Sequence, residues 1–114
     1  MSVPKKILFV CTINRMRSAS AHKMYKSDDR LVIDSAGTAD EARDKITHTN
    51  LEWADVIIVM ERHHRNAIRK RYLDIYYQKK IVCLHIPDEY DFMQKELIGI
   101  LKSKFEDVYQ VGLL

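Results

Sequence analysis

The amino-terminal stretch that organises the whole chain reads Ile7-Leu8-Phe9-Val10-Cys11-Thr12-Ile13-Asn14-Arg15-Met16-Arg17-Ser18. Its first four residues are apolar without alternation, which is typical of a strand buried on both faces of a parallel sheet. Helical spacing of apolar side chains follows Ser18, at Ala21, Met24 and Tyr25. The stretch therefore predicts a strand, a short polar loop and a helix, with Cys11 at the carboxyl end of the strand.

Three further apolar runs alternate with helical patterns along the chain. We expect strands over 31–33, 56–60 and 81–84, with a turn over 34–38 closing the second one. Helices are expected over 18–25, through Trp53 after a capping box of Thr49 and Glu52, along the basic stretch after residue 61 as far as Ile75, and from near Asp91 onward. Strands alternating with helices predict an α/β fold, a three-layer sandwich with a four-stranded parallel sheet.

Length and charge limit what the protein can be. The chain has 114 residues and a net charge of +3, which fits one domain over residues 1–114 and does not favour nucleic acid as a partner. Two cysteines make no disulfide framework, and no apolar run has the length of a secretion signal or a membrane span. We expect a monomeric cytoplasmic protein, in which a lone reactive thiol persists.

The loop after the first strand has the spacing Cys-x5-Arg-Ser. Five residues are enough to wrap a tetrahedral oxyanion, and the backbone N–H groups of residues 12–17 can point inward beside the positive end of the next helix. Arg17 offers a planar fork for two phosphate oxygens. The same positive field favours the thiolate form of Cys11, a nucleophile in position to attack a phosphoryl group. On spacing alone, the pattern also fits a buried cysteine and a surface arginine.

This stretch resembles the signature of the low-molecular-weight protein tyrosine phosphatases, a strand followed by C-x-x-N-x-x-R-S. Three later segments resemble that family in the same order: Asp34–Thr38, Ala54–Glu61 and Asp88–Tyr90. The resemblance implies a sheet in the order 2-1-3-4 with flavodoxin-like topology. It also implies that Asn14 takes a left-handed conformation to brace the loop, with support from a hydrogen bond to Ser35.

A carboxylic acid must face the loop in order to protonate the leaving group. Asp88, Glu89 and Asp91 all follow the fourth predicted strand. Asp91 has capping-box spacing from Gln94 and is expected to cap the last helix. The resemblance implies that Asp88 is the acid. Tyr90 either lines the cleft as an aromatic wall or is a half-buried loop residue.

The resemblance therefore implies a phosphomonoester hydrolase, a protein tyrosine phosphatase acting through a cysteinyl-phosphate intermediate. Cys11 attacks phosphorus, Arg17 holds the equatorial oxygens, and Asp88 acts first as acid and then as base. Ser18 is expected to steady the Cys11 thiolate. We expect no cofactor and no metal, because the loop supplies the positive charge. The expected partner is a phosphorylated protein or a small phosphoester.

Three departures from the family pattern bear on specificity. The chain is shorter, before the second strand and between Thr38 and Thr47, which removes part of the wall around the site. Met16 replaces a second loop cysteine, so no protective disulfide can form within the loop. Glu89 replaces a proline beside the acid, which leaves that loop less rigid.

Other functions fit parts of the pattern. A phosphatase-like arsenate reductase needs resolving cysteines, and only Cys83 is available, inside a predicted strand. A phosphocysteine carrier needs neither Arg17 nor Asp88. A non-catalytic phosphate-recognition module would keep the loop and lose turnover. The histidines predict no metal site, because His63 and His64 are adjacent and are expected to point to different helix faces.

Overall fold

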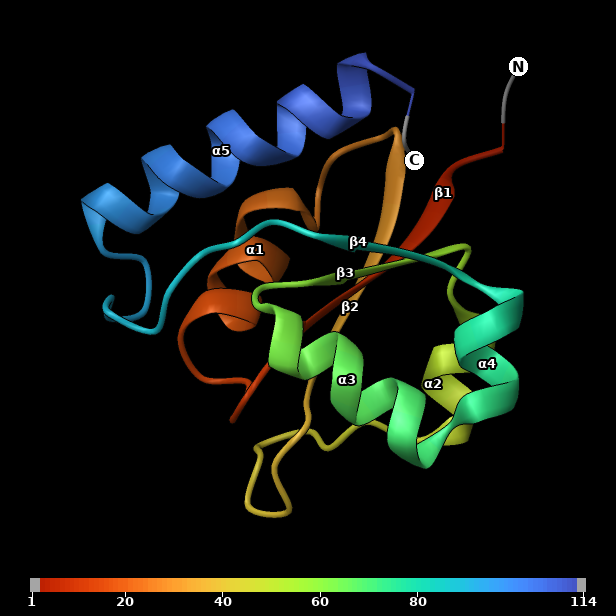
Figure 1. Cartoon of the computed structure of the whole chain (residues 1–114). Coiled ribbons are helices and arrows are strands. Elements are labelled where there is room, and N and C mark those ends of the chain that lie inside the picture. The colour runs from red at the N-terminus through yellow and green to blue at the C-terminus, as the bar shows by residue number, and fades with distance from the viewer. Residues whose placement is uncertain (1–2, 113–114) are drawn as a thin grey trace.

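The computed structural model describes residues 3–112 and is built on one parallel sheet (Figure 1). Its strands are β1 (Lys5–Cys11), β2 (Leu31–Gly37), β3 (Val56–Val59) and β4 (Lys80–Cys83). They pair in the order β2-β1-β3-β4, all parallel. The predicted α/β class and strand order are therefore confirmed. The change of direction in strand order falls at β1, the position where ligands bind in sheets of this kind.

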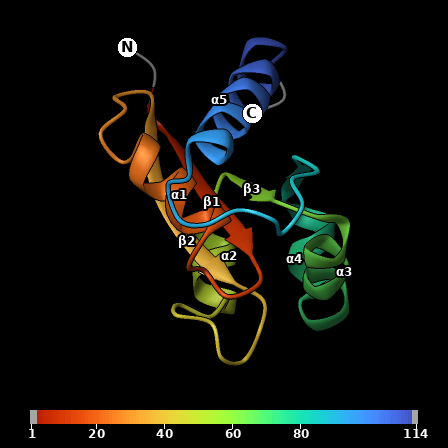
Figure 2. The same cartoon turned by 90° about the vertical axis from the view of Figure 1, so that its left-hand side faces the viewer.

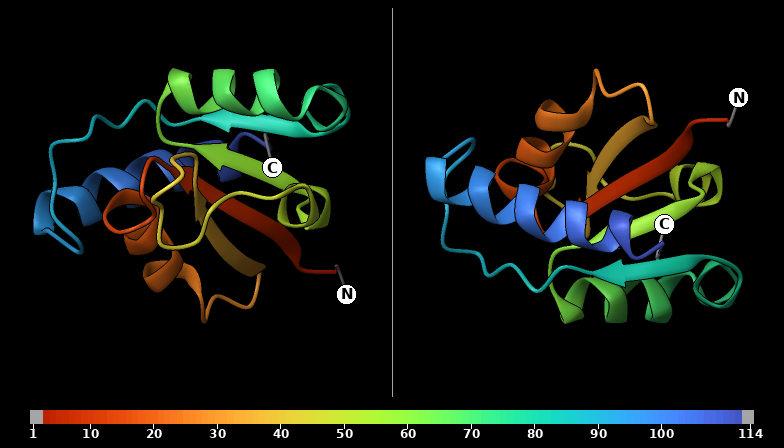
Figure 3. Two further views of the ribbon diagram at one scale, coloured as in Figure 1. Left: turned by 90° about the horizontal axis from the view of Figure 1, so that it is seen from below. Right: turned by 90° about the horizontal axis from the view of Figure 1, so that it is seen from above.

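Helices cover both faces of the sheet. The helices are α1 (Arg17–Tyr25), α2 (His48–Trp53), α3 (Arg62–Arg71), α4 (Leu73–Gln78) and α5 (Lys95–Gln110). Helices α1 and α5 lie on one face, and α2, α3 and α4 lie on the other (Figures 2 and 3). This arrangement confirms the predicted three-layer sandwich. None of the helices within residues 3–112 is long and apolar enough to cross a bilayer.

The central strand β1 contributes to two separate hydrophobic clusters. Ile7, Phe9 and Cys11 join the cluster formed with α1 and α5, whereas Leu8 and Val10 join the cluster on the opposite face. Because both faces are buried, the strand shows no apolar alternation in its sequence. The same register places Cys11 on the α1 side of the sheet, where the loop that follows it turns.

Strand β2 is longer than its apolar run predicted. Residues 34–37 continue the strand instead of turning, since Leu8 to Cys11 of β1 pair with Asp34 to Gly37. Because Asp34 and Ser35 are polar, the pattern of apolar residues in the sequence does not indicate this extension. Pairing with the central strand outweighs their low strand propensity.

Three helix boundaries also differ from the predictions. Helix α2 is capped by Thr47, whose hydroxyl accepts from the Asn50 N–H at 3.2 Å, and not by Thr49. The basic helix ends at Arg71, because the Tyr72 backbone leaves helical geometry, and α4 follows as a separate helix. Helix α5 begins at Lys95, after a left-handed Met93 with φ of 57° that no helix can include.

Candidate active site

The loop between β1 and α1 is braced by a chain of hydrogen bonds that ends at the cysteine. Asn14 is fully buried and left-handed, with φ of 58°, as the resemblance implied. Its Nδ2 donates to Ser18 Oγ at 2.7 Å, and that oxygen lies 2.9 Å from Cys11 Sγ. Because the Ser18 oxygen accepts from Asn14, its own proton is directed either at the sulfur or, across a longer 3.5 Å, at the Ala36 carbonyl.

The backbone of the loop presents donors without acceptors. Among the hydrogen bonds of residues 3–112, the backbone N–H groups of residues 12–16 donate to no protein acceptor. Their carbonyls are used instead, since Ala39 N donates to Thr12 O at 3.0 Å and Arg43 N donates to Ile13 O at 2.9 Å. N–H groups left free beside a helix N-terminus form a cradle for an anion.

Arg17 is 1% exposed and is held on one side only. Its Nη1 donates to the carboxylate of Glu61 and, at 2.8 Å, to the carbonyl of Ile86. On the other edge, Nε is buried without a partner, and Nη2 has only a 3.5 Å contact with Thr12 Oγ1 and a 3.9 Å contact with Asp88. The Nε and Nη2 edge thus offers two donors in the geometry that suits two oxygens of an anion.

Glu61 stands two residues after the end of β3, beside the carboxyl end of β1. Burial alone would raise the pKa of its carboxyl, but the hydrogen bond and charge of Arg17 lower it further than burial raises it. His63 Nε2 lies 3.3 Å from the same carboxylate oxygen. Glu61 is therefore ionised at neutral pH and balances the charge of the buried guanidinium.

His64 is fully buried and connects Glu61 to the loop. Its Nδ1 accepts from the Glu61 backbone N–H at 3.0 Å, so the ring proton lies on Nε2, which donates to Thr12 Oγ1 at 2.9 Å. Burial, with the nearby His63 and Arg17 charges, lowers the pKa of His64 to about 3. The ring is neutral and supports Thr12 from behind.

The placement of the two histidines corrects a prediction. His63 and His64 do not point to opposite faces, because their rings lie 4.0 Å apart at the start of α3 and converge on Glu61. These three residues have ligand atoms within 4.8 Å of one another. Both His64 nitrogens are already hydrogen-bonded and the Glu61 carboxylate is paired with Arg17, so the group is arranged to hold the guanidinium.

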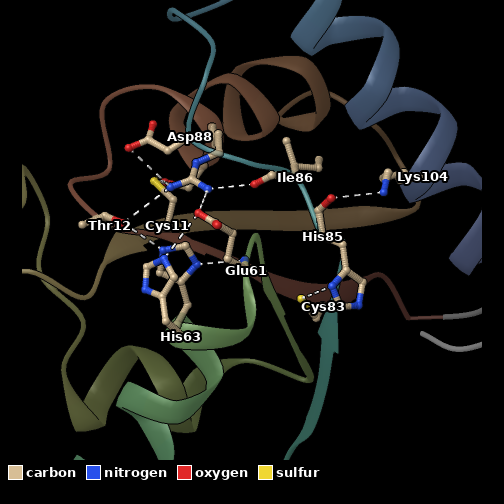
Figure 4. Close-up of polar contacts among 12 residues, drawn as sticks. Cys11, Thr12, Glu61, His63, Cys83, His85, Ile86, Asp88 and Lys104 are labelled. Carbon is tan, nitrogen blue, oxygen red and sulfur yellow. Dashed lines mark hydrogen bonds and ion pairs between the residues drawn. The ribbon is translucent and has the colours of Figure 1, made fainter.

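The candidate acid lies at the mouth of the loop. Asp88 is 66% exposed at its side chain, and its carboxylate lies 3.9 Å from Arg17 Nη2 (Figure 4). Glu89 is exposed, and Asp91 does not cap α5, because it is the Asp91 backbone N–H that donates to Gln94 Oε1 at 2.9 Å. Tyr90 is half-buried and packs against the cluster beneath α5. Of the three carboxylates, Asp88 alone contacts Arg17.

Ser35 does not support the loop in the way that the resemblance implied. Its hydroxyl lies 2.8 Å from Nδ1 of His22, a residue of α1, and among residues 3–112 it forms no hydrogen bond with Asn14. The Asn14 side-chain oxygen accepts from Arg43 Nη2 at 3.4 Å instead. Arg43 belongs to the short helix-free segment between Thr38 and Thr47, which folds back onto the loop.

The remaining loop residues line the turn without special contacts. Arg15 is exposed, and Ile13 and Met16 are partly buried. Sequence reasoning missed the roles of Glu61, His64 and the Ile86 carbonyl. The signal for Glu61 was its place after a central strand, since groups at the carboxyl ends of neighbouring parallel strands meet at one edge.

Comparison with solved structures places this fold among known phosphatases. The chain superposes on a low molecular weight protein tyrosine phosphatase from Streptococcus pyogenes with a TM-score of 0.74 and 21% identity, covering 93% of this chain and 92% of that one. The tyrosine phosphatase Wzb from Escherichia coli K30, in complex with phosphate, gives 0.76 and 20%, covering 96% and 99%. The YwlE arginine phosphatase from Geobacillus stearothermophilus gives 0.67 and 22%, covering 95% and 94%. No family model and no curated protein matches the sequence significantly.

Proposed function

We propose that the chain is a cysteine-dependent phosphomonoester hydrolase of the protein-tyrosine-phosphatase type. The observation that carries the proposal is the half-satisfied Arg17, whose Nη1 is anchored by Glu61 and Ile86 while its buried Nε has no partner. A buried donor left unpaired is costly, and the cost is offset when a ligand oxygen accepts from it. The tetrahedral dianion of a phosphoester supplies such oxygens and fits the unpaired backbone N–H groups of residues 12–16.

In the first step, the Cys11 thiolate attacks phosphorus. An S–P bond forms as the ester P–O bond breaks, and the leaving oxygen receives a proton from the Asp88 carboxyl group. The Arg17 fork and the loop N–H groups hold the three equatorial oxygens, where charge develops in the transition state. Ser18 stabilises the sulfur, which lies 2.9 Å from its hydroxyl oxygen.

In the second step, water hydrolyses the cysteinyl-phosphate. The Asp88 carboxylate takes a proton from the water as its oxygen attacks phosphorus, the S–P bond breaks, and its electron pair returns to Cys11 as thiolate. Inorganic phosphate leaves, and Asp88 is again protonated. The exposed position of Asp88 suits this double role, because solvent and the leaving alcohol both reach it.

The similar structures support a proposal for the substrate class. The similar structures include tyrosine phosphatases and an arginine phosphatase. We assign phosphotyrosine in proteins as the substrate, with phosphoarginine and small phosphoesters as the alternatives that a test must separate. We also propose that residues 1–114 act as one monomeric catalytic domain in the cytoplasm.

An arsenate reductase is less well supported than a phosphatase. Cys83 ends β4, which β3 separates from the β1 strand that carries Cys11. Its sulfur lies 3.5 Å from His85 Nδ1, and Figure 4 shows this pair apart from the loop. A resolving thiol would have to cross the sheet to reach Cys11.

The decisive experiment is hydrolysis of p-nitrophenyl phosphate by the wild type, Cys11→Ser and Cys83→Ser, followed by phosphotyrosine and phosphoarginine peptides. We expect Cys11→Ser to abolish turnover and Cys83→Ser to leave it intact. Rapid quenching of the wild type should trap one phosphoryl group on the peptide containing Cys11. Turnover that survives Cys11→Ser would overturn the proposal, and phosphate binding without turnover would indicate a recognition module.

A further inference from the structure

A second cleft lies beside the catalytic loop, on the outer face of α1. The cleft has a volume of about 330 Å³ and is lined by one face of α1, by the segment before α2 and by the segment before α5. We call it the α1 cleft, and its lining residues are Ala19, His22, Lys23, Lys26, Arg43 and Phe92. The catalytic mechanism uses none of these side chains.

The lining of the α1 cleft is cationic. Lys23, Lys26 and Arg43 carry full positive charges, and no lining residue carries a carboxylate. Within residues 3–112, neither Lys23 nor Lys26 forms an ion pair, and Arg43 has only a 3.8 Å contact with the exposed Asp44. Lys23 Nζ lies 5.6 Å from the centroid of the Phe92 ring, which fixes one side of the cleft. The cleft therefore offers unpaired cations to an anionic group.

The α1 cleft is joined to the phosphate loop by direct contacts. Arg43 donates from its backbone to Ile13 O at 2.9 Å and from its side chain to Asn14 Oδ1 at 3.4 Å. On the opposite side, Met93 N donates to Ser20 Oγ at 2.8 Å, which fastens the segment after Asp88 onto α1. The two walls of the cleft thus continue the walls of the candidate active site.

The distance along α1 sets which part of a substrate reaches the cleft. Lys23 follows Arg17 by six residues, about 9 Å at the rise of an α-helix. An extended peptide covers that distance in about three residues. Six residues also turn the helix by about 600°, so Lys23 leaves α1 about 120° around its axis from Arg17. A peptide that starts at Arg17 and runs along the cleft side of α1 brings a residue two to four positions from the phosphorylated one toward the cations of the cleft.

We propose that the α1 cleft binds an acidic side chain two to four residues from the phosphorylated residue of a protein substrate. The inference rests on the proposed phosphatase function and adds a sequence preference to it. Long-range attraction to unpaired cations also raises the rate of association with acidic substrates, and salt screens this effect.

The test compares two phosphotyrosine peptides, one with Asp and Glu at positions two to four on both sides and one with Asn and Gln there. The enzymes are the wild type, Lys23→Ala/Lys26→Ala, and the matched control Lys70→Ala/Lys80→Ala. The control removes two exposed lysines, one on α3 across the sheet from α1 and one in the edge strand β4. We expect the wild type and the control to prefer the acidic peptide by about three- to tenfold in kcat/KM at low salt, from about two surface ion pairs. The cleft variant should lose most of that preference.

Hydrolysis of p-nitrophenyl phosphate separates the phosphatase function from the sequence preference of the cleft, because this substrate is too small to reach the cleft. The cleft variant should hydrolyse it at the wild-type rate. Equal kcat/KM for the two peptides, or a preference that survives in the cleft variant, would overturn the inference while the phosphatase function stands. A wild type without turnover of any substrate would instead refute the proposed function. The affinities of the Cys11→Ser protein for the two peptides would then show whether the cleft binds acidic side chains.

Discussion

Arg17 and Glu61 form an ion pair behind the loop between β1 and α1, although they are 44 residues apart in the chain. Arg17 comes from the start of α1 and Glu61 follows the end of β3. The pair holds one edge of the guanidinium against the sheet and leaves the other edge to the ligand. The orientation of Arg17 is thus set by Glu61, which forms no hydrogen bond of its own with residues 12–16.

Removing the Glu61 charge should therefore disturb phosphate binding. In Glu61→Gln we expect kcat/KM for p-nitrophenyl phosphate to fall by about tenfold to a hundredfold, because the acceptor of the Arg17 hydrogen bond loses its charge. Vanadate affinity should fall in parallel, and Glu61→Asp should recover part of both. Unchanged or higher activity in Glu61→Gln would mean that Glu61 competes with phosphate for Arg17 and does not position it.

A substitution at Asp88 separates substrate binding from the chemical step. Its side chain is largely exposed and makes only one long contact, with Arg17, so Asp88→Asn should leave the fold intact. We expect kcat to fall by about 10²- to 10⁴-fold for a phosphotyrosine peptide, the usual contribution of general acid–base catalysis. The loss should be smaller for p-nitrophenyl phosphate, whose leaving group needs less protonation. Equal losses for both substrates would argue against Asp88 as the acid.

Gly37 is required where β2 passes close to the loop. A Cβ at this position would lie 2.5 Å from the Thr12 carbonyl oxygen and 2.7 Å from Ala42 Cβ. We expect Gly37→Ala to lower the free energy of unfolding by about 1–3 kcal/mol through overpacking and to reduce kcat/KM by displacing Thr12. The control is Gly99→Ala in α5, where a Cβ meets nothing within 4 Å and helix propensity predicts a gain. Urea unfolding of both variants tests the contrast.

The sheet and the loop were predictable from the sequence because they depend on local patterns. Uniform apolar runs identify strands buried on both faces, and the Cys-x5-Arg spacing places both groups on one strand–loop–helix unit. The predicted boundaries of strands and helices were wrong where strand pairing or a reversal of the chain overrides the local preference of the residues. The polar end of β2 is held by its register with β1, and α5 starts late because Met93 is left-handed.

The support of Arg17 was not predictable in the same way. Glu61 and the Ile86 carbonyl reach Arg17 from segments that follow β3 and β4, and their approach depends on the strand order and on the exact exit of each chain. Helical periodicity also predicted the wrong direction for the His64 side chain. It stands at the first turn of α3, where its ring reaches back to the backbone N–H of Glu61 instead of following the helix face.

His64 makes stability depend on pH in a direction that the structure fixes. Its pKa is about 3 in the folded protein and near its usual value of 6.5 once unfolded. The unfolded state therefore binds a proton at this position below about pH 6.5, whereas the folded state does not until about pH 3. The stabilising effect of the buried neutral ring is complete above pH 6.5 and is lost as the pH falls toward 3.

Urea unfolding between about pH 7.5 and about pH 5 measures this effect, which should approach 1.4 kcal/mol per pH unit below the unfolded pKa. His64→Gln keeps a donor and an acceptor but cannot titrate, so its stability should fall less steeply with acid. Gly99→Ala in α5, which changes no titrating group, supplies the control and should keep the wild-type slope. If His64→Gln and the wild type lose stability in parallel, protons enter elsewhere and the neutral His64 bridge between Glu61 and Thr12 is not what acid disrupts.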